Sequence, residues 1–542
     1  MKFKFLFSLF LGSALAMSAH GYKDGIEYYK ADQYENAKTI LNRTLNDAST
    51  DKSEAYYYLG EIALRQGDKT AASDYFQKGL AVNPENGFNY VGLGAAALLD
   101  GQEKVAEDYF KQARNHGKKN ADLMIAIARA YYNADPVKYA EDVNKSIERA
   151  QKIDKKAASI FVFQGDMKAA ENNVGEAAAL YENAILYEAN NPEAYVKYAN
   201  AYFSVNPEYA INKLQELLNV QPNSALAQRE LAEKYYQNDQ WAKAAQVYGD
   251  YMGNPNHLTE DAVRYSVLLY YGKFYDKSLK LAEELLVDDP KNFQLQRIVF
   301  LNKAALKDYT GAEKQAEVFF SLNDPKNEYT SNDYSSLGEV LHELGKDSLA
   351  IIQYEKAAEV NPGKVDVLKQ LSSAYYSMKQ YEKAAQAYQK VIDSGNFKTN
   401  DEYVLAGRYM TYGSVETDSL KRLDALNNAV KYIDIVLAKV DKDYRIPQRK
   451  ARILMIRNDN KPCQESTDAY NVVLSLLDAD ADSKAAHAQD YTEAYNQIAG
   501  FYILSGDVAT AKEYYLKTLE LNPDNEALRQ YVEKLKVDET KE

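Results

Sequence analysis

The chain repeats one pattern of small, aromatic and proline residues every 34 residues. Residues 53–86 show the unit best, since two apolar runs with helical i, i+3, i+4 spacing are separated by Gly67-Asp68 and closed by Asn83-Pro84. This pattern predicts two short helices joined by a tight turn. A lone helical hairpin of this size cannot bury its apolar face, so the fold must contain copies packed side by side.

The copies are present through most of the 542 residues. With Ser53 as position 1, a small residue occupies position 8 at Gly60, Gly94, Ala128, Gly165, Ala199, Ala232, Ser266, Gly338, Ser372 and Ala499. Position 20 is small at Ala72, Ala106, Ala177, Ala210, Ala244, Ser278, Ala312, Ala350, Ala384 and Ala511. Position 24 is aromatic at Phe76, Phe110, Tyr181, Tyr248, Tyr354, Tyr388 and Tyr515. Small residues on facing helices allow close approach, and the ring fills the seam between them.

This 34-residue phase resembles the tetratricopeptide repeat family. The resemblance implies an all-α fold, a right-handed superhelical solenoid of about 14 helix-turn-helix repeats. It also implies binding rather than catalysis, because this family is a binding scaffold used in many pathways.

The first 19 residues have the features of a bacterial signal peptide. Lys2 and Lys4 form a basic region, residues 5–16 are apolar, and Ala14-Leu15-Ala16 fits a small-x-small cleavage site. No other segment approaches the length that is needed to span a membrane. We therefore expect an exported, soluble, periplasmic protein with no direct membrane insertion.

The repeat phase divides the remaining chain into four parts. Residues 20–398 hold about eleven repeats. Residues 399–490 keep helical spacing but lose the phase, so we expect two divergent helical pairs, with helices at 402–411, 419–439, 447–457 and 464–478. The phase returns at 491–525, and residues 526–542 read as a C-terminal capping helix and tail.

Composition argues against several function classes. The formal net charge is −14, and loss of Lys2 and Lys4 with a signal peptide makes it −16, which disfavours binding to nucleic acid or anionic lipid. The five histidines are scattered without metal-ligand spacing. Cys463 is the single cysteine, so an internal disulfide is impossible. The sequence has no P-loop, nucleophile elbow or HExxH motif.

Two partial motifs match functional patterns only in their letters. Asp478-x-Asp480-x-Asp482 begins like a calcium loop, but Ser483 stands where glycine is needed and Gln489 where a bidentate glutamate is needed. Gly92-Leu93-Gly94 starts a dinucleotide fingerprint inside a repeat helix, with no strand before it. We therefore expect no metal, no cofactor, no small-molecule substrate and no enzymatic activity.

The resemblance also implies where a partner binds. In this family the first helix of each repeat lines the concave face, with positions 2, 5, 9 and 12 directed into it. Position 12 is aromatic in many repeats, and the repeats around Tyr236 are the richest. The predicted partner-binding residues are Phe203, Arg229, Glu233, Tyr236, Tyr270 and Arg297. The alternative is that these rings pack on the neighbouring repeat and complete the core.

The resulting hypothesis is a non-enzymatic protein–protein interaction scaffold of the bacterial cell envelope, which binds a partner segment in its concave groove. The alternative is a structural subunit of an envelope assembly, or of a polysaccharide or protein export apparatus, that docks on a membrane partner. In both cases the partner is a protein, and nucleic acid is not expected to bind.

Overall fold

The computed structural model describes residues 21–322, 326–479 and 483–535. These residues form 30 α-helices and no strand, so the expected all-α architecture is confirmed. The chain divides into two compact units, unit 1 (Met1–Asn302) and unit 2 (Lys303–Glu542). The predicted signal peptide, residues 1–19, lies outside the described residues.

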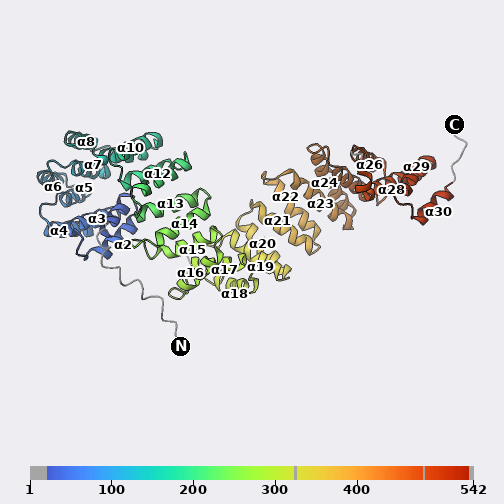
Figure 1. The fold of residues 1–542 in the computed structure, drawn as a ribbon, viewed down its shortest axis with the longest axis horizontal. Coiled ribbons are helices and arrows are strands. Elements are labelled where there is room, and N and C mark those ends of the chain that lie inside the picture. The colour runs from blue at the N-terminus through green and yellow to red at the C-terminus, as the bar shows by residue number, and fades with distance from the viewer. Residues whose placement is uncertain (1–20, 323–325, 480–482, 536–542) are drawn as a thin grey trace, which may run out of the picture. The chain divides into compact units, whose positions relative to one another are not determined.

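The helices follow one another as the first and second members of 14 pairs, with α27 and α30 left over among the described residues (Figure 1). The first eight pairs are α1 (Gly21–Lys30), α2 (Tyr34–Thr44), α3 (Lys52–Arg65), α4 (Lys69–Val82), α5 (Gly87–Leu99), α6 (Glu103–His116), α7 (Ala121–Ala134), α8 (Ala140–Ile153), α9 (Ala158–Ala170), α10 (Val174–Tyr187), α11 (Pro192–Tyr202), α12 (Pro207–Val220), α13 (Ala225–Gln237), α14 (Trp241–Met252), α15 (Asp261–Tyr271) and α16 (Tyr275–Leu285). The boundary between the units falls within α17 (Phe293–Ala305).

The remaining helices are α18 (Tyr309–Phe319), α19 (Ser331–Glu343), α20 (Asp347–Val360), α21 (Val365–Ser377), α22 (Tyr381–Asp393), α23 (Thr399–Val415), α24 (Ser419–Leu437), α25 (Arg445–Arg457), α26 (Gln464–Leu477), α27 (Ser483–Ala486), α28 (Ala488–Ser505), α29 (Val508–Leu521) and α30 (Glu526–Lys534). The helices expected within residues 399–490 are therefore present as α23 to α26. Helix α23 is longer at both ends than the sequence pattern predicts.

The contact between a small residue and a ring explains the 34-residue phase. A Cβ atom added to Gly60 would lie 2.4 Å from Phe76, and one added to Gly94 would lie 2.4 Å from Phe110. Neither ring can move aside in a packed seam, so position 8 stays small wherever the ring at position 24 lies across it. Position 20 is equally constrained, since its exposure is 0% at Ala72, Ala106, Ala177, Ala210, Ala244, Ser278, Ala312, Ala350, Ala384 and Ala511.

Ten of the hairpins turn at the same position of the repeat. Position 15 has a left-handed backbone, with φ between 57° and 85°, at Asp32, Gly67, Gly101, Asn172, Asp239, Lys273, Lys307, Gly345, Lys379 and Gly506. Glycine adopts this conformation without a Cβ clash, whereas the other residue types accept some strain. The turn is thus fixed by the repeat geometry and not by glycine alone.

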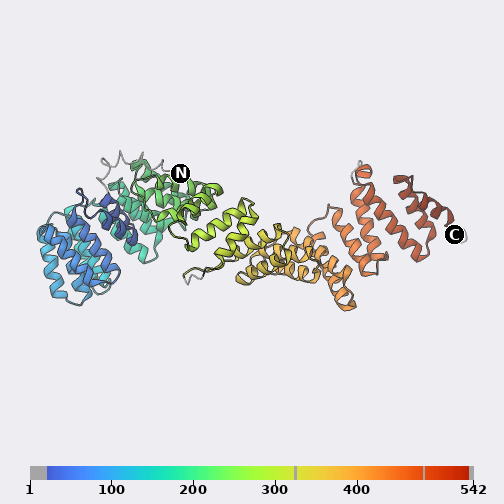
Figure 2. The same ribbon diagram turned by 90° about the horizontal axis from the view of Figure 1, so that it is seen from below.

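Unit 1 curls until its first repeat meets its sixth and seventh repeats. Helix α1 contacts α11 and α13 (Figures 1 and 2). Ile26 of α1 and Leu41 of α2 belong to one buried cluster with Leu226 and Tyr251 from the seventh repeat. The first repeat of unit 1 therefore packs on distant repeats as well as on its neighbour in sequence.

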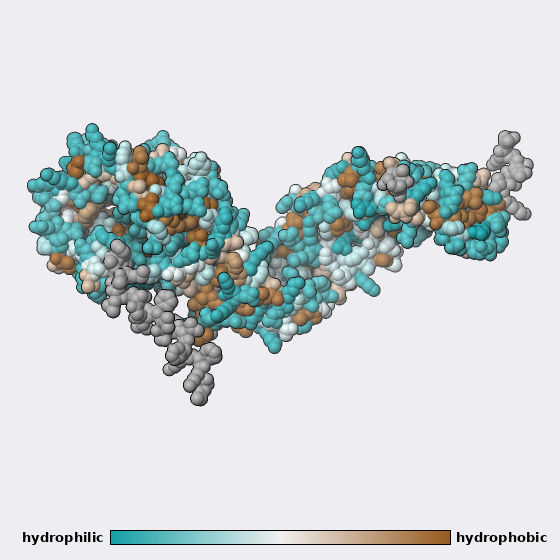
Figure 3. Space-filling view, viewed as in Figure 1, coloured by the Kyte–Doolittle hydropathy of each residue, from teal (hydrophilic) through white to brown (hydrophobic). Residues whose placement is uncertain are grey.

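The surface is mainly hydrophilic. On the face in Figure 3, apolar residues form small separate patches within each unit. Across the described ranges, no helix has both the length and the apolar character that crossing a bilayer requires.

Ala244→Leu tests the packing rule in helix α14. Extra volume at a fully buried seam forces side chains and backbone to shift, so we expect the free energy of unfolding to fall by about 1–3 kcal/mol. Ala242→Leu in the same helix is the matched control, because Ala242 is exposed. Urea denaturation measures both variants, and equal stabilities would contradict the assignment of position 20.

Candidate partner-binding cavity

The curl of unit 1 surrounds a cavity of about 610 Å³. Its lining comes mainly from the first helices of the first six repeats, α1, α3, α5, α7, α9 and α11, and therefore from the concave face. Positions 2, 5 and 9 line it as Glu54, Tyr57 and Glu61 in α3, and as Asp122, Ile125 and Arg129 in α7. At positions 2, 5 and 9 these two repeats follow the rule that the family resemblance implied, whereas Tyr132 at position 12 of α7 is not part of the lining.

One wall of the cavity is a continuous row of aromatic rings. Tyr34 contacts Tyr29, with ring centres 5.6 Å apart, and Tyr29 contacts Tyr58 at 5.0 Å. The row continues from Tyr58 to Tyr57 at 5.0 Å and from Tyr57 to Phe88 at 5.4 Å. Rings with hydroxyl tips offer broad apolar contact and hydrogen bonds at once, which suits a surface that exchanges water for a ligand.

Helices α7, α9 and α11 contribute a connected set of charges. Arg129 Nη1 lies 2.6 Å from Asp166 Oδ2, and Lys197 Nζ lies 3.0 Å from Asp166 Oδ1 and 2.8 Å from Asp32 Oδ2. Burial alone would raise the pKa of Asp166, but Arg129 and Lys197 lower it below its ordinary value. These charges neutralise one another and tie the turn of the first repeat to α11.

Several charged side chains of the lining, Lys30 and Glu61 among them, have no opposite charge within ion-pair distance in the described part of the chain. Lys30 of α1 presents its ammonium group to the cavity without such a partner. Glu61 accepts a hydrogen bond from Tyr29 Oη at 3.1 Å, and burial raises the pKa of its carboxyl group. A donor and an acceptor are thus available beside the aromatic wall, as the backbone of a bound peptide requires.

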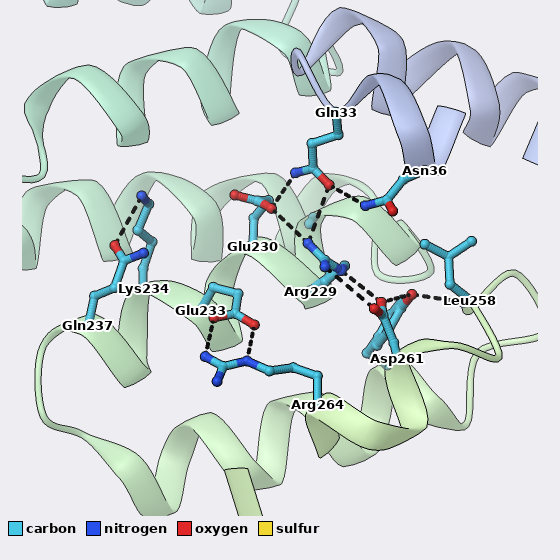
Figure 4. Close-up of polar contacts among 12 residues, drawn as sticks. Gln33, Asn36, Arg229, Glu230, Glu233, Lys234, Gln237, Leu258, Asp261 and Arg264 are labelled. Carbon is cyan, nitrogen blue, oxygen red and sulfur yellow. Dashed lines mark hydrogen bonds and ion pairs between the residues drawn. The ribbon is translucent and has the colours of Figure 1, made fainter. Parts of the chain in front are cut away.

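A clasp of side chains closes the curl, as Figure 4 shows. Gln33, in the turn between α1 and α2, donates to Glu230 of α13, 197 residues away. Arg229 donates to Gln33 Oε1 at 3.3 Å, and its Nε lies 2.8 Å from Asp261 Oδ2 of α15. Tyr251 Oη also donates to Asp261, at 2.8 Å. The predicted binding residue Arg229 therefore takes part in the closure of unit 1.

Two other predicted residues form a stacked ion pair with α15. Arg264 donates to Glu233 through two hydrogen bonds of 2.9 and 2.6 Å. The same guanidinium group lies over the ring of Tyr236, 4.4 Å from its centre. The charge of Glu233 and one face of Tyr236 are thus engaged within unit 1.

The last three predicted residues also have contacts within the unit. The ammonium group of Lys234 lies 4.9 Å from the ring centre of Phe203. Tyr270 contacts the rings of Tyr271 and Tyr275, and Arg297 lies over Phe293. None of the six predicted residues lines the 610 Å³ cavity. They lie along α11, α13, α15 and α17, and these six residues are called the ladder below. Their role in partner binding stays a prediction.

Apart from the sixth repeat, the cavity lies in repeats that the sequence did not single out. Repeats were ranked by the aromatic residue at position 12, whereas the cavity lining also includes many residues at positions 2, 5 and 9. The sequence places Tyr57, Glu61 and Arg129 at positions 5 and 9 of their repeats. The contact between the first and seventh repeats could not be predicted from the sequence, because Gln33 and Glu230 lie in no shared local pattern.

The partial motifs have structural explanations where they are described. Gly92 and Gly94 lie inside α5 and pack against the rings of Phe76 and Phe110. Cys463 is the half-buried N-cap of α26. Asp480 and Asp482 of the calcium-like sequence lie outside the described residues. Among the residues that are described, no group of three potential ligands could hold a metal ion.

The tetratricopeptide repeat family matches four stretches of the chain. They are residues 53–86, 334–364, 366–394 and 492–525. A curated relative, human protein O-mannosyl-transferase TMTC1, is 23% identical over 225 residues. The aligned stretch covers 37% of this chain and 24% of the relative, so the chain spans about a quarter of that protein's length.

Several solved structures resemble the chain at low identity. The C-terminal part of a tetratricopeptide repeat protein from Cytophaga hutchinsonii is 20% identical, with a TM-score of 0.38, and covers 49% of this chain and 98% of its own. A tetratricopeptide repeat protein from Parabacteroides merdae is 17% identical, with a TM-score of 0.32, and covers 48% and 99%. The human IFIT1 dimer with m7Gppp-AAAA is 16% identical, with a TM-score of 0.32, and covers 92% and 95%.

Two buried carboxyl groups on α1 make the stability of unit 1 depend on pH. Burial raises the pKa of Asp24 from 3.8 to about 7 and the pKa of Glu27 from 4.5 to about 7, and both lie on α1. The native state thus holds protons that the unfolded chain releases between about pH 4 and pH 7, so stability falls as pH rises through this range. One pKa unit corresponds to about 1.4 kcal/mol, which makes the difference measurable.

Urea denaturation at pH 5 and pH 8 tests this expectation, with unfolding followed by tyrosine fluorescence. The native protein should be more stable at pH 5, and Asp24→Asn should remove much of the difference. The control is Asp108→Asn, which changes an exposed carboxyl group on α6. A pH-independent stability, or the same pH dependence in the Asp24 variant, would refute the expectation.

Proposed function

We propose that this chain of tetratricopeptide repeats is a non-enzymatic scaffold that binds a segment of a protein partner on the concave face of unit 1. The observation that carries the proposal is the cavity of about 610 Å³, where an aromatic wall stands beside Lys30 and Glu61. Neither charge has an ion-pair partner in the described chain, so a ligand that supplies one gains a charge-assisted hydrogen bond.

The composition of the wall favours a protein ligand. Tyrosine rings provide large contact areas with little loss of side-chain entropy, and they are common among the residues that dominate protein–protein affinity. The backbone of a peptide carries alternating N–H and C=O groups, which Glu61 can accept from and Lys30 can donate to. The opposing network of Arg129, Asp166 and Lys197 holds the second wall in place.

The proposal includes export and a place in the bacterial cell envelope, supported by the basic and apolar residues at the start of the sequence. It also includes the absence of catalysis, because paired repeat helices occupy the described chain almost from end to end. The second candidate is a subunit of an envelope assembly or export apparatus. Copurification with a membrane protein favours that candidate, whereas a monomer that captures a non-membrane protein favours the scaffold.

Substitution of the cavity residues tests the proposed function. Tyr58→Ala combined with Lys30→Gln removes one ring of the wall and the ammonium group, so capture of the native partner should fall by at least about 10-fold. Tyr209→Ala is the matched control, because Tyr209 lies on α12, outside the cavity lining, and is 59% exposed. Affinity capture from an envelope extract, with quantitative mass spectrometry, measures the effect. Unchanged capture by a folded cavity variant would rule out the cavity as the binding site.

A second pair of substitutions tests the ladder on α13 and α15. Tyr236→Ala with Tyr270→Ala removes rings that contact Arg264, Tyr271 and Tyr275, so we expect a lower melting temperature and normal partner capture. Circular dichroism and the same capture assay measure the two effects. Loss of capture without a change in melting temperature would instead place the partner on the ladder.

A further inference from the structure

Unit 1 shows how this chain neutralises an arginine that is stacked on tyrosine. Arg264 of α15 lies over Tyr236 of α13, and Glu233, three residues before that tyrosine, accepts two of its hydrogen bonds. Burial lowers the pKa of Arg264, but the hydrogen bonds with Glu233 outweigh this effect and the pKa is raised. The guanidinium group of Arg264 thus has both a stacking ring and a neutralising carboxylate within the chain.

Unit 2 has the same arrangement without the carboxylate. Arg408 of α23 lies over Tyr376 of α21, with the guanidinium carbon 4.0 Å from the ring centre. The residue three before this tyrosine is Ser373, which is exposed and stands where Glu233 stands in unit 1. Arg408 has no ion pair within the described residues, and its buried Nε has no hydrogen-bond acceptor.

The next first helix repeats the arrangement. Arg449 of α25 lies over Tyr403 of α23, 3.7 Å from the ring centre. The residue three before Tyr403 is Asn400, again without charge. Arg449 Nη1 donates to the backbone carbonyl of Tyr403 at 3.1 Å, and a side chain at Gly407 would approach the same nitrogen to 3.1 Å. The glycine leaves the edge of this guanidinium group uncovered on that side.

The missing carboxylates do not reflect a shortage of acids. Asp and Glu number 79 against 65 Lys and Arg, and half-buried arginines elsewhere, such as Arg129 and Arg229, have carboxylate partners. The acids of α23 pair with other residues, since Asp401 lies 2.6 Å from Lys369 and Glu402 lies 2.6 Å from Lys439. Apart from Arg449 Nη1, which donates to Tyr403, the N–H groups of Arg408 and Arg449 have no acceptor among the described residues, and only the Nε of Arg408 is buried among them.

Burial lowers the pKa of both Arg408 and Arg449, in contrast to Arg264. A lowered pKa means that the charged form is less favourable in this environment than in water. An incoming carboxylate relieves that penalty, as Glu233 does for Arg264. The stacking on tyrosine fixes the plane of each guanidinium group and directs its N–H edge for two parallel hydrogen bonds.

We propose that Arg408 and Arg449 bind two acidic side chains of an extended segment of a protein partner. The two stacked arginines recur on adjacent first helices, and packed helices lie roughly 8–10 Å apart. Side chains two or three residues apart on an extended peptide span about 7–10 Å, so one segment reaches both. A single phosphate group is too small to bridge such a spacing. This site is separate from the unit 1 cavity, so it does not depend on the proposed function.

The test uses the full chain and a short labelled peptide in which Glu alternates with Gly. Fluorescence anisotropy at low salt should show binding, and a matched peptide with Gln in place of Glu should bind at least about 10-fold more weakly. Ser373→Glu should place a carboxylate on Arg408, as Glu233 does on Arg264, and weaken binding by a similar factor. Ser373→Gln is the steric control and should bind like the native protein.

Three results would overturn the inference. They are equal binding of the Glu and Gln peptides, native affinity in Ser373→Glu, and displacement of the peptide by inorganic phosphate at an equal concentration. Arg408→Gln with Arg449→Gln is the second variant, and it should abolish binding while circular dichroism shows an unchanged helix content. Normal binding by this folded variant would equally overturn the inference. None of these results concerns partner capture through the unit 1 cavity, which Tyr58→Ala with Lys30→Gln tests separately.

Discussion

The close approach of two helices, with a ring at position 24 lying across a small residue at position 8, is the contact from which the rest of the structure follows. At Gly60 and Gly94 no side chain fits, because Phe76 and Phe110 occupy the space. This contact fixes the two helices of a pair and leaves the other side of the first helix free. Side chains at positions 2, 5 and 9 of that helix consequently line the unit 1 cavity, as Tyr57, Glu61 and Arg129 do.

The sequence was sufficient to predict the helices and their pairing, because these depend on contacts within one repeat. The positions expected on the concave side came from the family resemblance. The hairpin turn was visible at Gly67 but not at Lys273 or Lys379, since a lysine in a left-handed turn has no distinctive sequence signal. The choice of repeats was the least predictable part. An aromatic residue at position 12 is equally compatible with the core and with a binding surface, and Tyr236 contacts an arginine of its own unit.

Charge pairing distinguishes the surfaces that are fixed from those that are open to a ligand. An ion pair in a half-buried place loses much of its hydration, and it is tolerated when both partners have good geometry. Asp166 between Arg129 and Lys197, and Glu233 on Arg264, satisfy this condition. Where Ser373 stands in place of such a glutamate, Arg408 stacks on Tyr376 without an ion pair in the described chain.

The contact of Gln33 with Glu230 also changes how unit 1 folds. An open array of repeats has only local contacts, so its ends can fray one repeat at a time and its contact order is low. Here the outermost repeat is joined to α13 across 197 residues of chain. Closing a loop of this length carries an entropic cost that grows with the logarithm of the loop length, and the cost is recovered only when both ends are formed. Unit 1 should consequently fold as one cooperative block, more slowly than a linear array of the same repeats.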